Sequence, residues 1–163
     1  MANSKSEKTA NLPKLNDFET WERKLVASYK KSAAKTQNAE AKIRPRKRST
    51  NVLKLEVYRY YDELIKAALI DKLREYVKQR DGNKWKGRGD EPEQWITRLV
   101  SSTEQTNNRV QWRSRLAAEM RLASVNKVRP DVLLGFLHEA GHIDLIKRAA
   151  ASKKTFSWAS AYQ

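Results

Sequence analysis

The sequence contains no cysteine, which excludes disulfide bridges and thiolate metal sites. A chain without disulfides fits a reducing compartment, so we expect a cytoplasmic protein, associated with a nucleoid or enclosed in a viral particle. No apolar run approaches the length of a membrane span, and residues 1–5 lack the apolar core of a signal peptide. We therefore expect no membrane partner.

Signatures of catalysis are also scarce. The five glycines of the 163-residue chain form no phosphate-binding loop, and neither a nucleophile elbow nor a recognisable Ser/His/Asp arrangement is present. Only two histidines occur, which leaves few candidates for metal binding or proton transfer. The sequence predicts a protein without a cofactor and without enzymatic activity.

One five-residue segment, His-Glu-Ala-Gly-His, begins at His138. It resembles the HExxH motif of the zincin metalloproteases, which implies zinc ligands at His138 and His142 and a general base at Glu139. The resemblance covers these five residues, and beyond them only Asp144 offers a third ligand. Gly141 is typical of the position just past a helix end, and a break there would remove the i, i+4 spacing that zinc requires. The resemblance nevertheless makes a small zinc hydrolase the alternative function from the enzyme class.

Positive charge dominates the composition, with 34 Lys and Arg against 19 Asp and Glu and a formal net charge of +15. The excess is uneven: +8 in residues 1–50, +1 in 51–81, +5 in 82–129 and +1 in 130–163. Such a balance favours a polyanionic partner, most of all nucleic acid, without distinguishing DNA from RNA.

The densest basic segment is residues 42–48, with five cations and no acidic residue. Arginine binds phosphate in a bidentate fork and lysine acts as a point charge, so we predict contact with the phosphate backbone. Pro45 favours an extended backbone, which would let the side chains follow a groove. The cations are Lys42, Arg44, Arg46, Lys47 and Arg48. A solvated linker or a nuclear-import signal is the alternative.

A second basic region is an expected helix after residue 107, which carries Arg109, Arg113, Arg115 and Arg121. No acidic residue occurs from residue 107 to 118, so these arginines have no local carboxylate partner in the sequence and favour phosphate recognition. A solvated helix face is the alternative.

Residues 130–150 outline a helix–turn–helix, which we interpret as a packing hairpin because its second helix offers few base-reading side chains.

The loop between the two expected central helices interleaves an aromatic side chain with cations, in Lys84, Trp85, Lys86 and Arg88. A nucleic-acid base can stack on an exposed tryptophan while cations hold the neighbouring phosphates. Alternatively, Trp85 folds back as a lid on the core. Both interpretations stay open at this point.

Apolar residues recur at helical spacing along most of the chain, and no strand rhythm is present. We predict an all-α fold, a compact bundle of about five helices with a flexible basic N-terminal arm. The longest expected helix begins after a cap at residues 49–51 and ends at Asp81, and Asn16 is expected to cap the first helix. The predicted boundaries are a disordered arm at 1–15, an amphipathic helix with a basic extension and linker at 16–50, a helical core at 51–151 and a tail at 152–163.

These patterns together predict a non-enzymatic protein that grips the phosphate backbone of nucleic acid largely independently of sequence. Four aromatic residues outside the expected core faces, Trp85, Trp112, Trp158 and Tyr162, favour self-association or a larger nucleoprotein assembly with this chain as a coat-like or accessory subunit. A basic adaptor for an acidic protein surface is a further alternative.

Metal analysis separates the zinc alternative from this interpretation. We expect the purified protein to contain no stoichiometric zinc, because a glycine inside the motif separates its two histidines. Zinc at one equivalent that is lost on His142→Ala would contradict this expectation and support the hydrolase.

Overall fold

The computed structural model describes residues 12–34, 42–44, 47–86, 89–101, 107–141, 146–148 and 151, without the side chains of 107–109. Its α-helices are α1 (Phe18–Ala33), α3 (Ser49–Lys66), α4 (Ile70–Asp81), α5 (Pro92–Ser101), α6 (Asn107–Val125) and α7 (Leu133–Ala140). Two short 3-10 helices, η2 (Gly82–Trp85) and η3 (Pro130–Val132), follow α4 and precede α7. No strand occurs within these ranges, so the predicted all-α class is confirmed.

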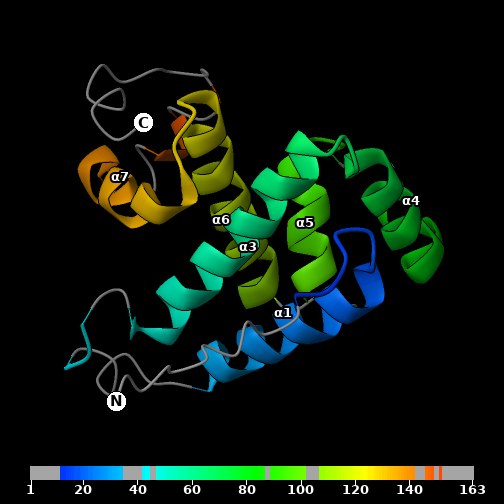
Figure 1. Ribbon diagram of the computed structural model, residues 1–163, viewed down its shortest axis with the longest axis horizontal. Helices are drawn as coiled ribbons and strands as arrows, with labels where there is room; N and C mark the ends of the chain where they lie inside the picture. Colours follow the sequence, from blue (N-terminus) through cyan, green and yellow to red (C-terminus); the bar gives the residue numbers. More distant parts are fainter. Residues whose placement is uncertain are drawn as a thin grey trace, which may run out of the picture.

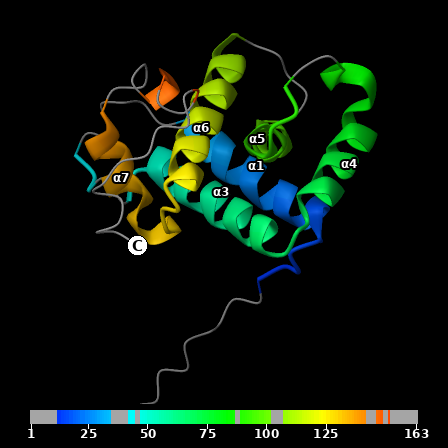
Figure 2. The ribbon, with the colours of Figure 1, turned by 90° about the horizontal axis from the view of Figure 1, so that it is seen from above.

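Helices α1, α3, α4 and α6 surround α5, which lies between α4 on one edge and α6 on the other (Figures 1 and 2). Helices α1 and α3 pack against each other and run in opposite directions. Their pairing is visible in two contacts, a ring stack between Trp21 and Tyr60 at 4.1 Å and a hydrogen bond of 2.6 Å from Ser28 Oγ to Glu56 Oε2. The last turn of α1 therefore lies beside the start of α3.

Helix α5 supplies the centre of the hydrophobic core. The side chains of Trp95, Ile96, Leu99 and Val100 are buried, and helices α1, α3, α4 and α6 pack against α5. Fully burying one such aliphatic side chain stabilises the fold by about 1.5–3 kcal/mol. The core also includes Phe18 on α1, so the first helix belongs to the same core as the helices after residue 51.

Tyrosine hydroxyls on α3 tie this helix to distant segments. Tyr58 donates to the carbonyl oxygen of Val128 at 2.8 Å, and Tyr61 donates to Glu93 Oε1 at 3.0 Å. Burial, with the nearby carboxylates, raises the pKa of both hydroxyls above 10.0. These buried phenols therefore stay protonated donors at neutral pH.

Residues 12–15, which the sequence assigns to the disordered arm, are attached to the bundle. The Trp21 Nε1 donates to the carbonyl of Lys14 at 3.2 Å, and the Tyr60 hydroxyl donates to the carbonyl of Leu15 at 2.8 Å. Residues 1–11 and the predicted tail at 152–163 lie outside the described residues.

The single helix predicted to run to Asp81 is wrong, because the chain breaks between α3 and α4. Ala68 has a φ of 54°, its N–H donates to the carbonyl of Ile65, and the N–H of Leu69 donates to the carbonyl of Leu64. This pair of bonds is a Schellman motif, which ends a helix at a left-handed residue. The position usually holds glycine, and alanine gave no signal of a helix end.

Other helix ends follow the sequence more closely. Pro130 opens η3, and Gly141 ends α7 with a φ of 95°, both as predicted. The cap of α1 is a correction, because Asp17 and not Asn16 accepts the backbone N–H of Thr20 at 3.2 Å. Among the described residues, no helix combines the length and the hydropathy of a membrane span.

The left-handed alanine generates a stability prediction. Replacing Ala68 with glycine should raise the free energy of unfolding by about 0.5–1 kcal/mol, because glycine adopts a positive φ without the Cβ clash. The neighbouring Ala67→Gly is the matched control, since Ala67 has a φ of −85° and is equally exposed. The control should be neutral or destabilising in denaturant unfolding, and a gain of equal size in both variants would contradict the assignment.

Candidate nucleic-acid interface

Helix α1 ends and α3 begins at the lower left of Figure 1, and the segments there carry five exposed cations. We call this surface the basic end and define it as Lys30, Lys31, Lys42, Arg44 and Lys47. The opposite directions of α1 and α3 bring these side chains to one end of the molecule although they come from two separate segments.

The described segments that form the basic end contain no carboxylate. Residues 23–34, 42–44 and 47–55 carry nine Lys and Arg and no Asp or Glu. The first acidic residue on α3 is Glu56, which already accepts the hydroxyl of Ser28. Within the part of the chain that the structure describes, Lys42, Arg44 and Lys47 form no ion pair. Glu119 of α6 contacts one of the nine, Lys54, at 2.9 Å, and the exposed cations of the basic end outnumber these two carboxylates.

Hydrogen bonds to backbone carbonyls before α3 hold part of the basic segment 42–48 in place. The N–H of Lys47 donates to the carbonyl of Arg44 at 2.8 Å, and Arg48 Nε donates to the carbonyl of Ile43 at 3.1 Å. Arg48 is the N-cap residue of α3, and the first turn of that helix has no acidic residue. Of the predicted cluster, Arg46 lies outside the described residues.

The arginines of α6 do not form the exposed basic face that the sequence suggests. Arg113 is only 7% exposed, and its Nη1 donates to Ser101 Oγ at 3.1 Å. Arg115 is exposed but contacts Glu119 Oε1 at 3.4 Å, one turn further along the helix. The side chain of Arg109 lies outside the described residues.

The Arg121 side chain points toward Glu93 on α5 and toward Glu91, which precedes that helix. Its guanidinium lies 3.5 Å from Glu91 and 3.7 Å from Glu93. The expectation that the α6 arginines have no carboxylate partner is therefore wrong for Arg115 and Arg121. Glu119 lies just beyond residues 107–118, and Glu91 and Glu93 come from an earlier part of the chain.

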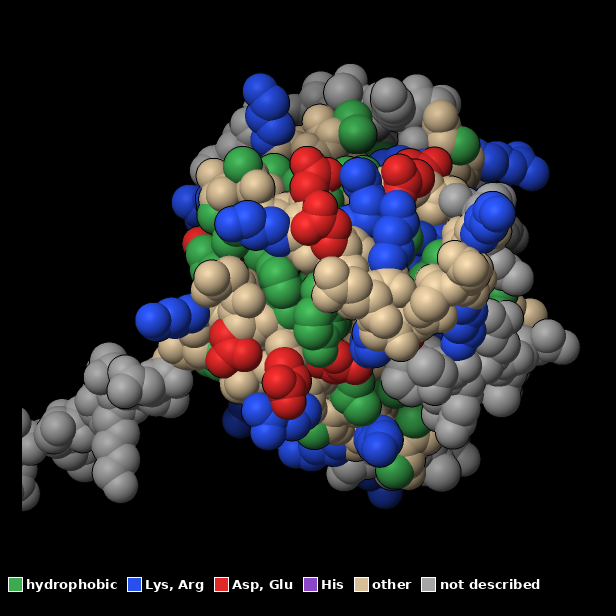
Figure 3. Space-filling view, turned by 90° about the vertical axis from the view of Figure 1, so that its right-hand side faces the viewer, with side chains coloured by type: hydrophobic (Ala, Val, Ile, Leu, Met, Phe, Trp, Pro, Cys, Tyr) green, Lys and Arg blue, Asp and Glu red, His purple; other side chains and the backbone are tan. Residues whose placement is uncertain are grey.

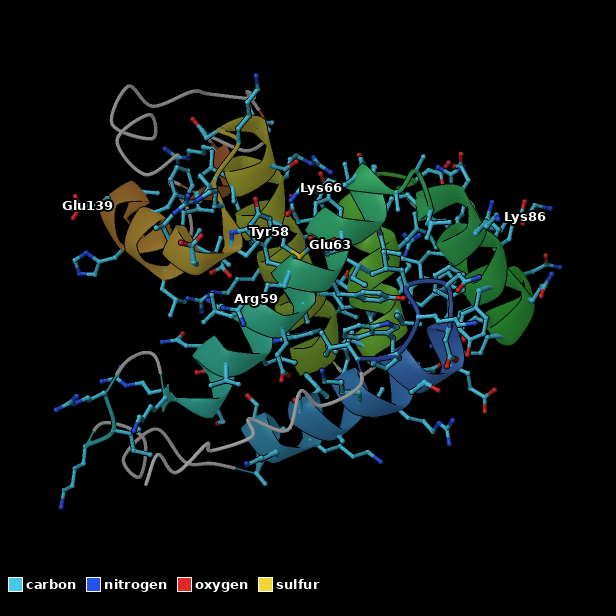
Figure 4. All side chains as sticks on the ribbon, in the orientation of Figure 1. Tyr58, Arg59, Glu63, Lys66, Lys86 and Glu139 are labelled. Atoms are coloured by element: carbon cyan, nitrogen blue, oxygen red, sulfur yellow. The ribbon has the colours of Figure 1, made fainter. Side chains whose placement is uncertain are left out.

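The aromatic loop folds inward. Trp85 is 6% exposed, and its Nε1 donates to Asp81 Oδ2 at 2.6 Å. Of the two interpretations, this burial favours the lid over base stacking. Lys84 stays close to the ring, with Nζ 5.3 Å from the centroid, whereas Lys86 is exposed and lies at the edge of the molecule beside α4 (Figure 4). Arg88 lies outside the described residues.

A buried arginine that sequence reasoning missed lies beside this tryptophan. Arg98 on α5 is 4% exposed, and its Cζ lies 4.7 Å from the ring of Trp85 and 4.3 Å from that of Trp95. Its Nη2 also donates to the carbonyl of Gly89 at 2.7 Å and to Gln94 Oε1 at 2.8 Å. The available signal was Trp95 three residues earlier, since positions i and i+3 share a helix face.

Arg113 of α6 reaches the same tryptophan. Its Cζ lies 5.2 Å from the ring centroid of Trp85, so the ring contacts arginines from two helices. Such cation–π contacts contribute about 0.5–2 kcal/mol each, with the larger values at desolvated sites. The structure thus brings Trp85 of the predicted loop and Arg113 of the predicted helix into direct contact.

An ionic network fixes the position of Trp85. Arg80 contacts Asp81 at 2.8 Å and Glu22 of α1 at 2.7 Å, and it donates to the carbonyls of Arg98 and Leu99 in the last turn of α5. Burial alone would lower the pKa of Arg80, but Asp81 and Glu22 outweigh it and raise that pKa. Burial would likewise raise the pKa of Asp81, but the hydrogen bonds from Arg80 and Trp85 outweigh it and lower that pKa.

A cavity of about 590 Å³ opens between η2, α5 and α6. Four cations from three segments border it, namely Arg98, Arg113, Arg121 and Lys147. The rest of its described lining is Trp85, Gly89, Gln94, Thr97, Val110, Ser114, Ala117, Ala118 and Ala151. None of these lining residues is acidic.

The side of the molecule formed by α4 has a different character. Figure 3 shows Lys and Arg side chains there interspersed with Asp and Glu. Arg74, for example, lies 3.0 Å from Asp71 and 3.2 Å from Asp90. Carboxylates therefore offset part of the positive charge on this face.

Of the two histidines of the zincin-like motif, only His138 lies on a described helix. Helix α7 ends at Ala140, and Gly141 adopts a positive φ before His142, which lies outside the described residues. The side chain of His138 is 88% exposed, and Glu139 points away from the body of the molecule (Figure 4). Among the described residues, no group of three His, Cys, Asp or Glu could hold a metal ion.

Comparisons with protein families, with curated proteins and with solved structures find no match to this chain. Charge, burial and geometry of its own side chains therefore carry the functional interpretation.

The lowered pKa of Asp81 generates a pH prediction. A carboxyl group whose folded pKa lies below its ordinary 3.8 contributes stability above that pH and loses it as the pH falls through the folded value. Asp81→Asn should therefore lower the free energy of unfolding by about 1–3 kcal/mol at pH 7, and the difference should shrink below pH 3.8.

Denaturant unfolding from pH 2.5 to pH 7 measures this difference. The control is Asp71→Asn, because the Asp71 side chain is 81% exposed and its pairing with Arg74 should contribute less than about 1 kcal/mol. A loss in Asp81→Asn that stays constant over the whole pH range would show that the charge of Asp81 is not what stabilises the network.

Proposed function

We propose that this protein binds nucleic acid through its phosphate backbone at the basic end, without catalysis and largely independently of base sequence. One observation carries the proposal: exposed cations from two segments converge at an end whose described residues contain no Asp or Glu. The net charge of +15 supports the same partner class.

The physical basis is the exchange of counterions for protein cations. Each phosphate that a lysine or arginine neutralises releases condensed counterions, so affinity falls steeply as the salt concentration rises. Phosphate oxygens are the same at every nucleotide, and contacts with them orient the protein but carry no sequence information. Binding by exposed lysines and arginines therefore predicts weak base selectivity.

The attachment of the cations to helix ends favours binding over a solvated linker. Lys30 and Lys31 belong to the last turn of α1, and the segment before α3 is closed by the contacts of Lys47 and Arg48 with nearby carbonyls. Cations held by a folded scaffold lose less conformational freedom on binding than those on a free chain.

The other predicted contacts contribute less to this proposal. Arg113 and Trp85 are buried, and the guanidinium groups of Arg115 and Arg121 already contact carboxylates. Lys86 is exposed and remains a candidate for a peripheral phosphate contact.

Assembly into a larger nucleoprotein particle stays a prediction of the sequence. Of the four aromatic residues behind it, Trp85 is buried and Trp112 packs against Tyr29 with ring centroids 4.7 Å apart. Trp158 and Tyr162 lie outside the described residues.

The test is a salt titration of nucleic-acid binding by a charge-neutralised variant. Replacing Lys42, Arg44 and Lys47 with glutamine should weaken binding and reduce the slope of log K against log salt by up to about 3 for duplex DNA and about 2 for single strands. Fluorescence anisotropy with labelled duplex DNA, single-stranded DNA and RNA measures the slope and identifies the preferred polymer.

A control variant separates local contacts from net charge. Arg59, Lys72 and Lys127 are exposed cations outside the basic end, and changing all three to glutamine lowers the formal charge by the same amount. Equal slopes for the two variants would mean that net charge alone attracts the polymer. Absence of polynucleotide binding at low salt, or equal affinity for polyglutamate, would overturn the proposal, the latter in favour of an acidic protein partner.

A further inference from the structure

The cavity between η2, α5 and α6 differs from the basic end because two of its four lining cations are buried. Arg98 and Arg113 are 4% and 7% exposed, yet both border an open space of about 590 Å³. Buried guanidinium groups cost free energy unless their surroundings compensate the charge. The contacts that compensate two buried guanidinium groups beside a cavity therefore need an explanation that exposed surface charge does not.

The surrounding contacts hold these two guanidinium groups in position. The ring of Trp85 lies beside both, at 4.7 Å from Arg98 and 5.2 Å from Arg113. Arg98 is also bonded to the carbonyl of Gly89 and to Gln94, and Arg113 to Ser101. Since Trp85 is itself bonded to Asp81, the rotamers of both arginines are restrained before any ligand arrives.

The charge around the cavity is positive on balance. Four cations line it and none of its described lining residues is acidic. The nearest carboxylates that contact a lining cation are Glu91 and Glu93, both beside Arg121. Even if each of these two carboxylates offsets one charge, the lining keeps an excess of two positive charges, which matches a dianion.

The shape and chemistry of the wall indicate the class of ligand. The volume lies within the range of about 300–1,000 Å³ that is typical of small-molecule sites. Arginine forks fit phosphate oxygens, and hydroxyl and amide groups of Gln94, Thr97 and Ser114 add further polar contacts. Val110 and Ala118 provide an apolar part of the wall, suited to the uncharged remainder of a nucleotide.

We propose that this cavity binds a phosphate group of a nucleotide-sized ligand, at a site separate from the basic end. The phosphate would lie between Arg98, Arg113 and Lys147, with Arg121 at the rim. A free nucleotide and the phosphorylated end of a nucleic-acid strand present the same group, and the experiment distinguishes these two sources. The proposal does not depend on backbone binding at the basic end.

Isothermal titration calorimetry of the full chain at low ionic strength tests the proposal, with pyrophosphate and ATP as probes. We expect both to bind at one site per chain. Lys147→Gln and Arg121→Gln should each weaken pyrophosphate binding by about 3- to 10-fold, as expected for the loss of one charge-assisted contact. Lys72→Gln, which removes an exposed cation from α4, is the matched control and should leave the affinity unchanged.

Arg113→Lys adds a sharper variant, since it keeps the charge but loses the planar fork that stacks on Trp85. It should weaken pyrophosphate binding at least as much as Lys147→Gln does. Should this buried substitution prevent folding, as circular dichroism would show, the two variants at Arg121 and Lys147 decide the outcome.

Two outcomes would overturn the inference. One is the absence of binding by pyrophosphate and ATP, and the other is equal weakening by Lys147→Gln and Lys72→Gln, which would indicate general charge attraction. A short oligonucleotide with and without a 5′-phosphate supplies the second arm. Tighter binding of the phosphorylated strand, lost in Lys147→Gln, assigns the site to strand ends, whereas ATP binding without that preference assigns it to free nucleotides.

The basic-end variant keeps this inference distinct from the proposed function. Glutamine at Lys42, Arg44 and Lys47 should leave pyrophosphate affinity unchanged while it weakens polynucleotide binding. The inference therefore fails or holds on the pyrophosphate data, and the proposed function on the polynucleotide data.

Discussion

The hydrogen bond from the Trp85 indole to Asp81 is the contact on which the positive cavity depends. Asp81 ends α4, and its other interaction, with Arg80, connects α4 to Glu22 on α1 and to the last carbonyls of α5. The bond directs the tryptophan ring inward, where it contacts Arg98 and Arg113. Without it, two guanidinium groups from different helices would lose the surface that lets them lie close together in the interior. The cation–π contacts of Trp85 therefore depend on the polar network of Asp81 and Arg80.

The chain therefore displays its positive charge in two physically different ways. Cations at the basic end are exposed to water, so they cost little desolvation free energy and are screened by salt. They suit long-range attraction of a polymer. Arg98 and Arg113 beside the cavity are buried and restrained, which costs folding free energy but strengthens each interaction with a bound anion. Surface charge of the first kind supports rapid and unselective association. Charge of the second kind is selective for ligand size and shape.

Much of the fold was predictable because helical periodicity is a local property. The stripe of apolar residues on α1 and the end of α7 at Gly141 follow from the sequence within a few positions. The break at Ala68 was not predictable, since alanine rarely occupies a left-handed position. For the candidate site, the exposure of Lys42 and Arg44 agreed with simple charge reasoning. The burial of Arg98 and Arg113 did not, because it depends on tryptophan and serine residues at other places in the chain.

The break at Ala68 also affects how the molecule opens. It separates α4 from α3, so α4 lies at one edge of the bundle and is attached mainly through α5, η2 and the Arg80 contacts (Figure 2). Native-state fluctuations release edge elements of this kind more readily than the interior. Detachment of α4 would withdraw Asp81 and Trp85 and dismantle one wall of the cavity. An anion that binds only the closed form therefore opposes that opening by mass action, and the amide hydrogens of α4 would exchange with solvent more slowly when the cavity is occupied.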